Sequence, residues 1–256
     1  MDFESNKKIS ALVITLNEEI HINTLLNDLA FVDEVVVVDS FSSDNTKSIC
    51  ENFSEVKFIQ NKFENFTSQR NFAIAQAKND WILFLDADER LTPELKNEIL
   101  YTIKNNKTHT AFLFYRTFMF KNKVLNYSGW QTDKIYRLFN KNFAKYSKER
   151  LVHEKLKVEG SVGILKNRLI HYSFSDFESY KSKMINYGKL KGQEKFIKKL
   201  KPIIFTSIIH PTYNFLYNYF IRLGILDGRK GVIICYLNAY SVYIRYQELQ
   251  KLWKEK

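Results

Sequence analysis

Two aspartates separated by one residue form the sharpest chemical feature of the sequence. Asp86-Ala87-Asp88 follows the apolar run Trp81–Leu85 and precedes Thr92-Pro93-Glu94, where a capping Thr and a first-turn Pro predict the start of a helix. Carboxylates at the end of a buried strand suit Mg²⁺ or Mn²⁺, which bind one or two carboxylates together with substrate phosphates. An acidic cluster that stabilises the N-terminus of the following helix is the alternative interpretation.

Two further polar clusters follow predicted strands in the same half of the chain. Asn17-Glu18-Glu19 follows the apolar run Ile9–Leu16, and Asp39 ends the β-branched run Glu34–Asp39. Asp39 could hydrogen-bond a base or a ribose, or it could cap a turn, a role that Asp44 fits better. Ligands of parallel sheets gather at the carboxyl ends of strands, so we expect all three clusters to converge on one edge.

The elements that position these clusters alternate between strand and helix. Val56–Ile59 is a third predicted strand, and Phe66–Ala77 is a predicted helix before the Trp81–Leu85 strand. This alternation predicts an α/β fold with a mostly parallel sheet. From residue 111 to 172 the pattern changes to aromatic-rich strands, and from Phe174 onward it becomes helical and basic.

Length and composition narrow the class of protein. The chain has 256 residues, of which 45% are hydrophobic and 15% aromatic, and this excludes a disordered or low-complexity chain. Cys50 and Cys235 lie far apart and fit neither a disulfide framework nor a zinc site, so we expect a reducing cytoplasm. The first residues show no signal-peptide pattern.

Charge is distributed unevenly along the chain. Residues 1–140 carry 16 Lys or Arg and 19 Asp or Glu, whereas residues 141–256 carry 23 and 9. The basic half contains two stretches without formal charge, Pro202–Ile221 and Gly231–Ile244, and a dense lysine run, Lys189–Lys201, precedes the first. These stretches are interpreted either as helices that lie in a membrane interface or as a buried helical pair.

Three segments of the first half together resemble a known family. LVITLNEE, VDEVVVVDSFSSDNT and QRNFAIAQAKNDWILFLDADE are similar, in order and spacing, to the inverting family 2 glycosyltransferases of the GT-A fold. Four later segments, GWQTDKIYRLFNK, RLVHEKL, LIHYSFSDFESYKSKMINYG and GILDGRKG, resemble the lipopolysaccharide core glucosyltransferase branch. The resemblance covers residues 9–250 and is most specific over 9–90.

The resemblance implies a nucleotide-sugar donor, with UDP-glucose as the best guess, and a divalent metal, Mg²⁺ or Mn²⁺. In the family pattern Asp88 ligates the metal, and Asp86 faces the ribose or the metal and its bound waters. A metal there neutralises charge that builds on the leaving nucleoside diphosphate. The remaining implied donor-binding residues are Leu16, Asn17 and Glu18 at the nucleotide, Asp39 at the base, Arg70 near the nucleotide, and Ala87.

The resemblance also implies a base that removes the proton from the acceptor hydroxyl. The family places a catalytic acid in the stretch that contains Glu154, with His153 to orient it or to contact phosphate. The alternative is an ordinary salt-bridged Glu beside Arg150 and Lys155. Asp133 is the second candidate for the base.

Gly129 and Trp130 precede Asp133 and are candidates for acceptor binding, with Trp130 as a platform on which a sugar stacks. A packed aromatic is the alternative interpretation of Trp130. For His171, which precedes a predicted helix, we expect a structural role.

We therefore expect a GT-A glycosyltransferase domain over residues 1–172 and a basic, helical, membrane-associating region over 173–256. Within the first, residues 1–110 would bind the nucleotide-sugar, and residues 111–172 would supply the acceptor site and catalysis. The expected acceptor is a glycolipid, such as a heptose of the lipopolysaccharide core. The protein would attach peripherally to anionic lipids on the cytoplasmic face of the inner membrane, and no nucleic acid partner is expected.

Two other functions fit the sequence less well than glycosyl transfer. A non-catalytic module that binds membranes or nucleic acid would not need the three sheet-edge clusters, which are all intact. A nucleotidyltransferase would want a Gly-rich phosphate loop after the first strand, where this chain has Leu16-Asn17-Glu18-Glu19.

Overall fold

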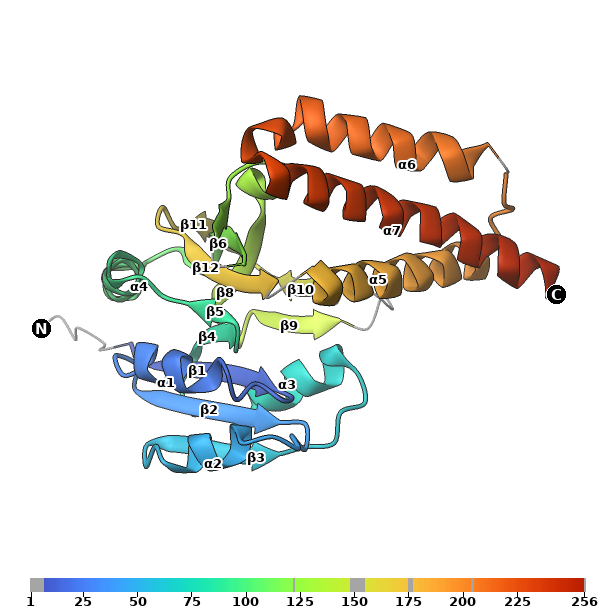
Figure 1. The fold of residues 1–256 in the computed structure, drawn as a ribbon. Coiled ribbons are helices and arrows are strands. Elements are labelled where there is room, and N and C mark those ends of the chain that lie inside the picture. The colour runs from blue at the N-terminus through green and yellow to red at the C-terminus, as the bar shows by residue number, and fades with distance from the viewer. Residues whose placement is uncertain (1–6, 122, 148–154, 175–176, 204, 256) are drawn as a thin grey trace, which may run out of the picture. The chain divides into compact units, whose positions relative to one another are not determined.

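The computed structural model describes residues 7–121, 123–147, 155–174, 177–203 and 205–255. These residues form two compact units (Figure 1). The first holds the described residues of 7–116, 134–147 and 155–171, and the second holds those of 117–133 and 172–255. The grouping of residues 117–133 with the C-terminal helices was not predicted from the sequence. The proposed functional division at residue 172 remains a prediction.

A mostly parallel sheet organises the first unit. Its strand order begins β3-β2-β1-β4, all parallel, and continues with antiparallel β8 and β6. These six strands are β1 (Ile9–Thr15), β2 (Glu34–Asp39), β3 (Val56–Gln60), β4 (Trp81–Asp86), β6 (His109–Phe120) and β8 (Lys134–Asn140). The shorter strands are β5 (Glu89–Arg90), β9 (Ala144–Ser147), β10 (Lys155–Val158), β11 (Ser161–Ile164) and β12 (Leu169–Phe174). The expected α/β fold with a mostly parallel sheet is confirmed.

Four helices flank the parallel strands of the first unit. They are α1 (Ile22–Asp28), α2 (Thr46–Glu51), α3 (Phe66–Gln76) and α4 (Pro93–Asn105). Because strand side chains alternate between faces, β1 sends Ala11 and Val13 into a core shared with α1, α2 and α4, and Leu12 into another shared with α3. The predicted cap of α4 is confirmed, since Thr92 Oγ1 accepts a hydrogen bond from Leu95 N at 3.2 Å.

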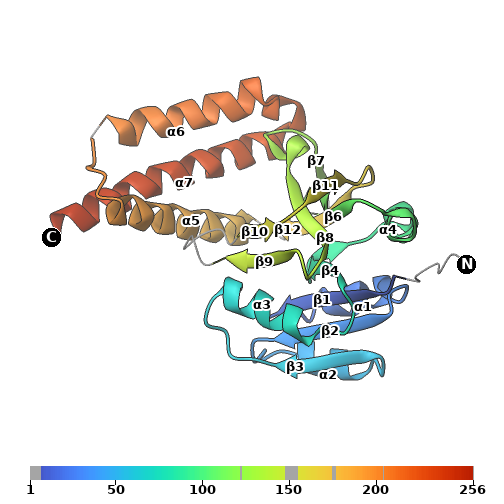
Figure 2. The ribbon, with the colours of Figure 1, turned by 180° about the vertical axis from the view of Figure 1, so that it is seen from behind.

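Helices make up most of the second unit (Figure 2). Its elements are β7 (Lys123–Leu125), η1 (Trp130–Thr132), α5 (Phe177–Ile197), α6 (Thr206–Leu216), the π-helical η2 (Tyr217–Ile221), η3 (Gly224–Asp227) and α7 (Arg229–Lys254). α7 packs against both α5 and α6. Two glycines allow α5 to approach α7 closely: a Cβ added at Gly188 would lie 2.6 Å from Ser241 O, and one at Gly192 would lie 2.8 Å from Arg245 O.

The two uncharged stretches of this unit have different surroundings. Gly231–Ile244 lies within α7, where Ile234, Leu237 and Val242 are buried. Pro202–Ile221 spans α6 and η2, and most of its large apolar side chains are exposed. Across the described residues, no helix has both the length and the apolar character needed to cross a membrane.

Candidate active site

The three predicted polar clusters converge on one edge of the first unit's sheet. In the strand register Thr15 of β1 pairs with Asp39 of β2, and Ile14 pairs with Asp86 of β4. The carboxyl ends of β1, β2 and β4 therefore lie side by side. Asp88 follows β4 by two residues, and Asn17 follows β1 by two residues.

The loops after β1 and β2 are joined by hydrogen bonds. Asn17 adopts a left-handed backbone conformation (φ +56°), which Asn tolerates better than most residues. Its N–H donates to Ser42 Oγ at 2.8 Å, and its Oδ1 accepts from Ser43 N at 2.8 Å. Glu18 N donates to Thr46 Oγ1 at 2.8 Å. The two loops thus form one surface beside exposed Leu16.

Asp39 is fully buried beneath these loops. Its carboxylate accepts hydrogen bonds from Thr15 Oγ1 at 3.0 Å, Ser42 N at 2.9 Å and Gln60 Nε2 at 3.3 Å. In this conformation the side chain holds the ends of three strands together. Contact between Asp39 and a nucleotide base remains a proposal.

Asp86 is bound by two arginines. Its Oδ1 accepts from Arg70 Nη2 at 3.0 Å, and its Oδ2 accepts from Arg137 Nη2. Arg137 is fully buried, and it also donates to Glu89 Oε1 from Nε at 3.2 Å and from Nη2 at 2.7 Å. Glu89, equally buried, accepts the Asp86 N–H at Oε2 at 3.0 Å. These bonds fix the backbone turn that carries Asp86-Ala87-Asp88, and the Ala87 methyl is buried in the core.

The electrostatics follow from this pairing. Burial disfavours the charged form of Asp86, but Arg137 and Arg70 hold its pKa well below the usual range. Burial also disfavours a charged Arg137, but Asp86 and Glu89 raise its pKa. Burial raises the pKa of Glu89, and Arg137 opposes this shift. Asp86 and Arg137 therefore form a permanent ion pair, and Asp86 acts as a fixed anchor.

Asp88 has a different partner. Its Oδ2 lies 3.1 Å from His171 Nε2, and His171 Nδ1 lies 3.3 Å from Arg116 Nη1. A guanidinium only donates hydrogen bonds, so His171 Nδ1 accepts from Arg116, and the ring carries its proton on Nε2, facing Asp88. Glu18 lies in the same environment. Burial, together with the negative charges of Asp88, Asp86 and Asp44, raises the pKa of its carboxyl group to about 7.

This group of residues fits a divalent cation. The Asp88 carboxylate is an oxygen ligand of the kind that such a cation prefers, and the Nε2–H of His171, 3.1 Å from Oδ2, orients it. Burial is the main cause of the raised pKa of Glu18, and the nearby carboxylates of Asp88, Asp86 and Asp44 add negative charge that a cation would offset. Among the described residues, no group of three His, Cys, Asp or Glu side chains could hold a metal ion. A cation here would thus need further ligands from substrate phosphates or water.

Both oxygens of Asp86 are bonded to arginines, which differs from the expectation that Asp86 also ligates the metal. His171, expected to be structural, instead contacts the Asp88 carboxylate. The roles of Arg137, Glu89 and Arg116 were not predicted from the sequence. The only sequence signal for Arg137 was a lone arginine in the apolar run KIYRLF, because a charge on a buried strand requires a partner.

The predicted acceptor residues belong to the second unit. Gly129 has a φ of +93°, and the Trp130 ring packs on Phe118 with ring centroids 4.2 Å apart. Asp133 ends η1, and its N–H donates to Trp130 O at 3.2 Å. The acceptor-binding roles of Gly129 and Trp130 and the role of Asp133 as a candidate base stay predictions. His153 and Glu154 lie outside the described residues.

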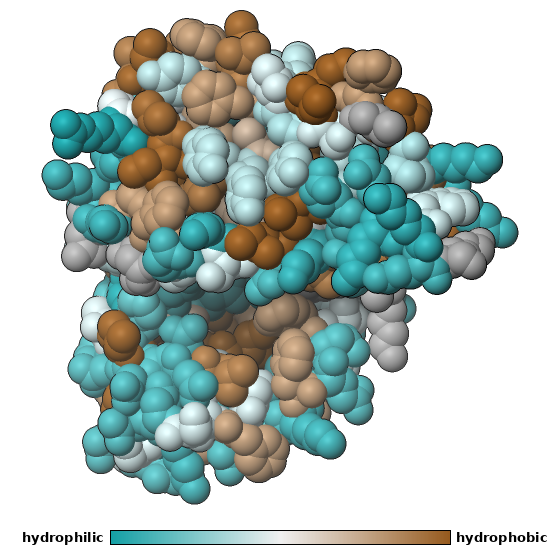
Figure 3. Space-filling view, turned by 45° about the vertical axis from the view of Figure 1, so that its right-hand side comes forward, coloured by the Kyte–Doolittle hydropathy of each residue, from teal (hydrophilic) through white to brown (hydrophobic). Residues whose placement is uncertain are grey.

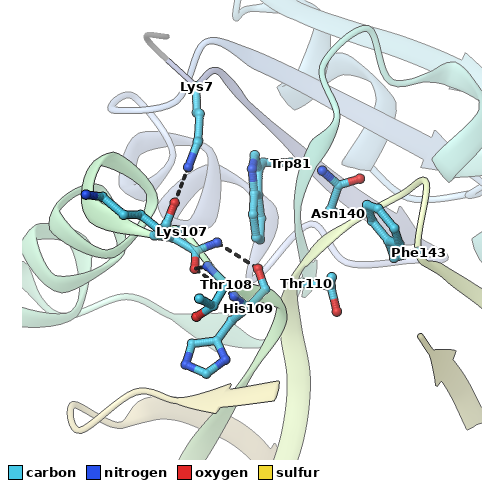
Figure 4. Close-up of a pocket in the computed structure, with 9 residues that line it drawn as sticks. Lys7, Trp81, Lys107, Thr108, His109, Thr110, Asn140 and Phe143 are labelled. Atoms are coloured by element: carbon cyan, nitrogen blue, oxygen red, sulfur yellow. Dashed lines mark hydrogen bonds between the residues drawn. The ribbon is translucent and has the colours of Figure 1, made fainter. Parts of the chain in front are cut away.

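A cavity of about 340 Å³ lies at the opposite end of β4 (Figure 4). Trp81, the first residue of β4, lines it together with Asn140 and Phe143, and Lys7 at its rim donates to Asn106 O. None of the predicted site residues that the structure describes lines this cavity.

Comparisons with known proteins find relatives that match nearly the whole chain. An uncharacterized glycosyltransferase of Rickettsia bellii is 29% identical over 257 residues, covering 96% of this chain and 87% of that protein. The lipopolysaccharide core biosynthesis glycosyltransferase LpsC of Rhizobium meliloti is 24% identical, with 93% of each chain covered.

The fold also matches a solved enzyme structure. The mannosyltransferase PcManGT of Pyrobaculum calidifontis, solved with GDP-Man and Mn²⁺, has a TM-score of 0.57 at 14% identity, covering 99% of this chain and 89% of that one. Residues 10–160, which include β1 to β4 and the Asp86-Ala87-Asp88 turn, match the family described as glycosyl transferase family 2. With more than half of its length inside that match, the chain belongs to glycosyl transferase family 2.

Proposed function

We propose that the protein transfers a sugar, with UDP-glucose as the first donor to test, to a sugar of a lipopolysaccharide core, in a metal-assisted displacement that inverts the anomeric carbon. The observation that carries the donor half is the Asp88–His171 pair beside the anchored Asp86 at the carboxyl end of β4. The similarity to LpsC over 93% of both chains supports the acceptor class.

Each residue of the edge has a task in this proposal. Asp88, oriented by the Nε2–H of His171, would hold a divalent cation, whose chemistry is to neutralise charge on the leaving nucleoside diphosphate. Asp86 keeps Arg70 in place, and Arg70 is packed over the rings of Phe84 and Tyr146, at 5.0 and 5.3 Å. Held in this way, Arg70 faces the edge where the nucleotide would bind.

The remaining proposed donor contacts come from the loop after β1. Leu16, Asn17 and Glu18 lie on the surface that the two joined loops form, and Asp39 supports it from below. Ala87 can offer a ligand only its backbone, because its methyl is buried.

The acceptor hydroxyl also needs a base that takes its proton as it attacks. We assign this role to Glu154, oriented by His153, with Asp133 as the second candidate. Trp130 and Gly129 would contact the acceptor sugar. A base positioned in this way contributes about 10²–10⁴-fold to the rate.

Donor cleavage by the purified full chain tests the proposal. UDP-, GDP- and dTDP-sugars are incubated with Mn²⁺, and release of the nucleoside diphosphate is measured. We expect cleavage with a uridine donor, and a loss of at least about a hundredfold in Asp88→Asn, because the charge of the leaving group is then poorly neutralised. The exposed Glu64→Gln, in the same unit, is the matched control.

The outcomes separate the parts of the proposal. Cleavage that Asp88→Asn retains would overturn the metal assignment. Cleavage retained by Glu154→Gln but lost in Asp133→Asn, measured with a core oligosaccharide acceptor, would move the base to Asp133. No cleavage and no metal-dependent binding of any donor would overturn the donor proposal itself.

A further inference from the structure

The outward face of α6 has an unusual composition. Six large apolar residues of α6 and the segments that flank it are each between 46% and 72% exposed. We call this the α6 face: Phe205, Ile208, Ile209, Tyr213, Leu216 and Phe220. Intervals of three and four residues place them on one side of the helix. Figure 3 shows apolar side chains gathered at the top of the view, where α6 lies.

The opposite side of α6 accounts for its packing within the unit. Ser207 is buried, and the ring of His210 stacks on Tyr246 of α7 at 5.3 Å. α7 therefore covers one side of α6, and the packing within the unit does not use the α6 face. From Pro202 to Ile221 the sequence holds no formal charge at all.

A surface helix of the first unit shows the ordinary pattern. α4 buries Leu95, Ile99 and Ile103 and turns Glu94 and Lys104 to solvent, and Leu100 and Tyr101 are its exposed large apolar residues. The stretch 205–220, which includes α6, exposes six such residues and no charged one. A contiguous exposed apolar surface of this kind marks an interaction site.

Positive charge borders the α6 face at both ends. Lys198 and Lys201 are exposed just before α6, and Arg229 is exposed just after η3. Residues 173–256 carry 15 Lys or Arg against 6 Asp or Glu. Of the acids, Asp227 is buried and accepts from Asn126 N and Tyr127 N, so it does not offset the surface charge.

The apolar face and the positive charge that borders it distinguish between two candidate partners, a second copy of the chain and a lipid membrane. A second copy of the chain would bring the same basic surface against itself, and the like charges would repel. A membrane with anionic lipids accepts apolar side chains and neutralises the bordering lysines. α6 has eleven residues and is about 16 Å long, half of a bilayer core of about 30 Å, so it fits along the surface.

We propose that the α6 face docks the protein on the surface of an anionic lipid bilayer, with α6 lying in the interface. This goes beyond glycosyl transfer and does not depend on the identity of the donor or acceptor. Phe and Ile would enter the acyl boundary, and Tyr213 would sit at headgroup level, where aromatic residues with a polar tip are favoured.

Cosedimentation with vesicles tests the apolar contribution. The full chain is mixed with vesicles of phosphatidylcholine and phosphatidylglycerol in equal parts, and the apolar variant is Phe205→Ser/Ile209→Ser/Leu216→Ser. We expect its partition coefficient to fall at least about tenfold. The control Leu100→Ser/Tyr101→Ser removes exposed apolar residues of α4 and should partition like wild type. Wild type that stays in the supernatant, or an apolar variant that partitions like the control, overturns the proposal.

The charge contribution has its own variants. Lys198→Gln/Lys201→Gln should weaken binding by about fivefold per lysine, whereas Lys104→Gln/Lys107→Gln in the first unit should not. Binding should also weaken as salt rises and be weaker on pure phosphatidylcholine. Equal binding to both vesicle types overturns the anionic part of the proposal.

A reporter and a mass measurement identify the occupant. In Phe205→Trp, brominated phosphatidylcholine in the same vesicles should quench the added tryptophan, and in Tyr101→Trp it should not. Sedimentation velocity without lipid should show a monomer for wild type and for the apolar variant. A wild-type dimer that the apolar variant converts to monomer would overturn the lipid proposal and assign the α6 face to a second copy.

Discussion

The end of β4 and the α6 face depart from ordinary burial in opposite directions. At the end of β4, Arg137 and Glu89 are ionisable side chains without exposed surface, and Asp86 joins them. On the α6 face, Phe205 and Ile209 are large apolar side chains with most of their surface exposed. Each arrangement is unfavourable by itself, because water solvates charges and excludes apolar groups.

The two regions differ in which groups offset the unfavourable free energy. The charges at β4 are compensated inside the first unit, since Arg137 bonds both Asp86 and Glu89. The described part of the chain offers the α6 face no such cover, so its compensation has to come from a partner. Breaking the first region should therefore reduce stability, whereas breaking the second should reduce binding and leave stability unchanged.

The largest effect is expected from Arg137→Met. The substitution leaves Glu89 buried without its main partner, and breaking a buried ion pair in this way costs about 3–5 kcal/mol. Urea unfolding at fixed pH, followed by circular dichroism, measures the change. Arg168→Met, at an exposed arginine of the same unit, is the control and should change stability by less than about 1 kcal/mol.

A second variant checks the reason for this loss. Arg137→Met/Glu89→Leu removes both fully buried ionisable side chains and should recover part of the lost stability, because no unpaired carboxyl group remains at position 89 and Asp86 keeps Arg70. If Arg137→Met alone unfolds at the wild-type urea concentration, the ion pair does not hold the β4 turn.

The strands of the first unit were predictable because local and global preferences agree there. The runs ISALVIT, EVVVVD and WILFLD are buried on both faces, and a continuous apolar stretch is typical of a parallel strand. The convergence of Asp39 and Asp86 followed from the same reasoning, since parallel strands end at one edge.

The partners of these side chains could not be predicted, because they come from distant positions in the chain. Arg137 is 51 residues from Asp86, and His171 is 83 residues from Asp88. Likewise, Pro202–Ile221 and Gly231–Ile244 both lack charge, and the sequence left open whether either is buried or interfacial. Tertiary packing separates them: α7 contacts both α5 and α6, so its apolar residues are covered, whereas those of α6 face outward.

A smaller effect, on ligand affinity, is expected from His171→Ala. Losing a group that contacts Asp88 should weaken Mn²⁺ affinity, measured by calorimetry in the presence of UDP, by at least about tenfold. The control is His109→Ala, because His109 lines the cavity at the other end of β4. Unchanged Mn²⁺ affinity in His171→Ala would contradict a role for His171 in orienting Asp88 toward the cation.

The smallest effect, and the sharpest contrast with Arg137, is expected from Phe205→Ser. The side chain is 72% exposed, and substitutions at such surface positions usually change the free energy of unfolding by less than about 0.5 kcal/mol. Phe118→Ser is the comparison in the same unit, because Phe118 is buried in its core and its loss should cost about 3–5 kcal/mol. Urea unfolding measures both. A Phe205→Ser loss near that of Phe118→Ser would mean that the fold itself uses the α6 face, and the face would then no longer need a partner to explain it.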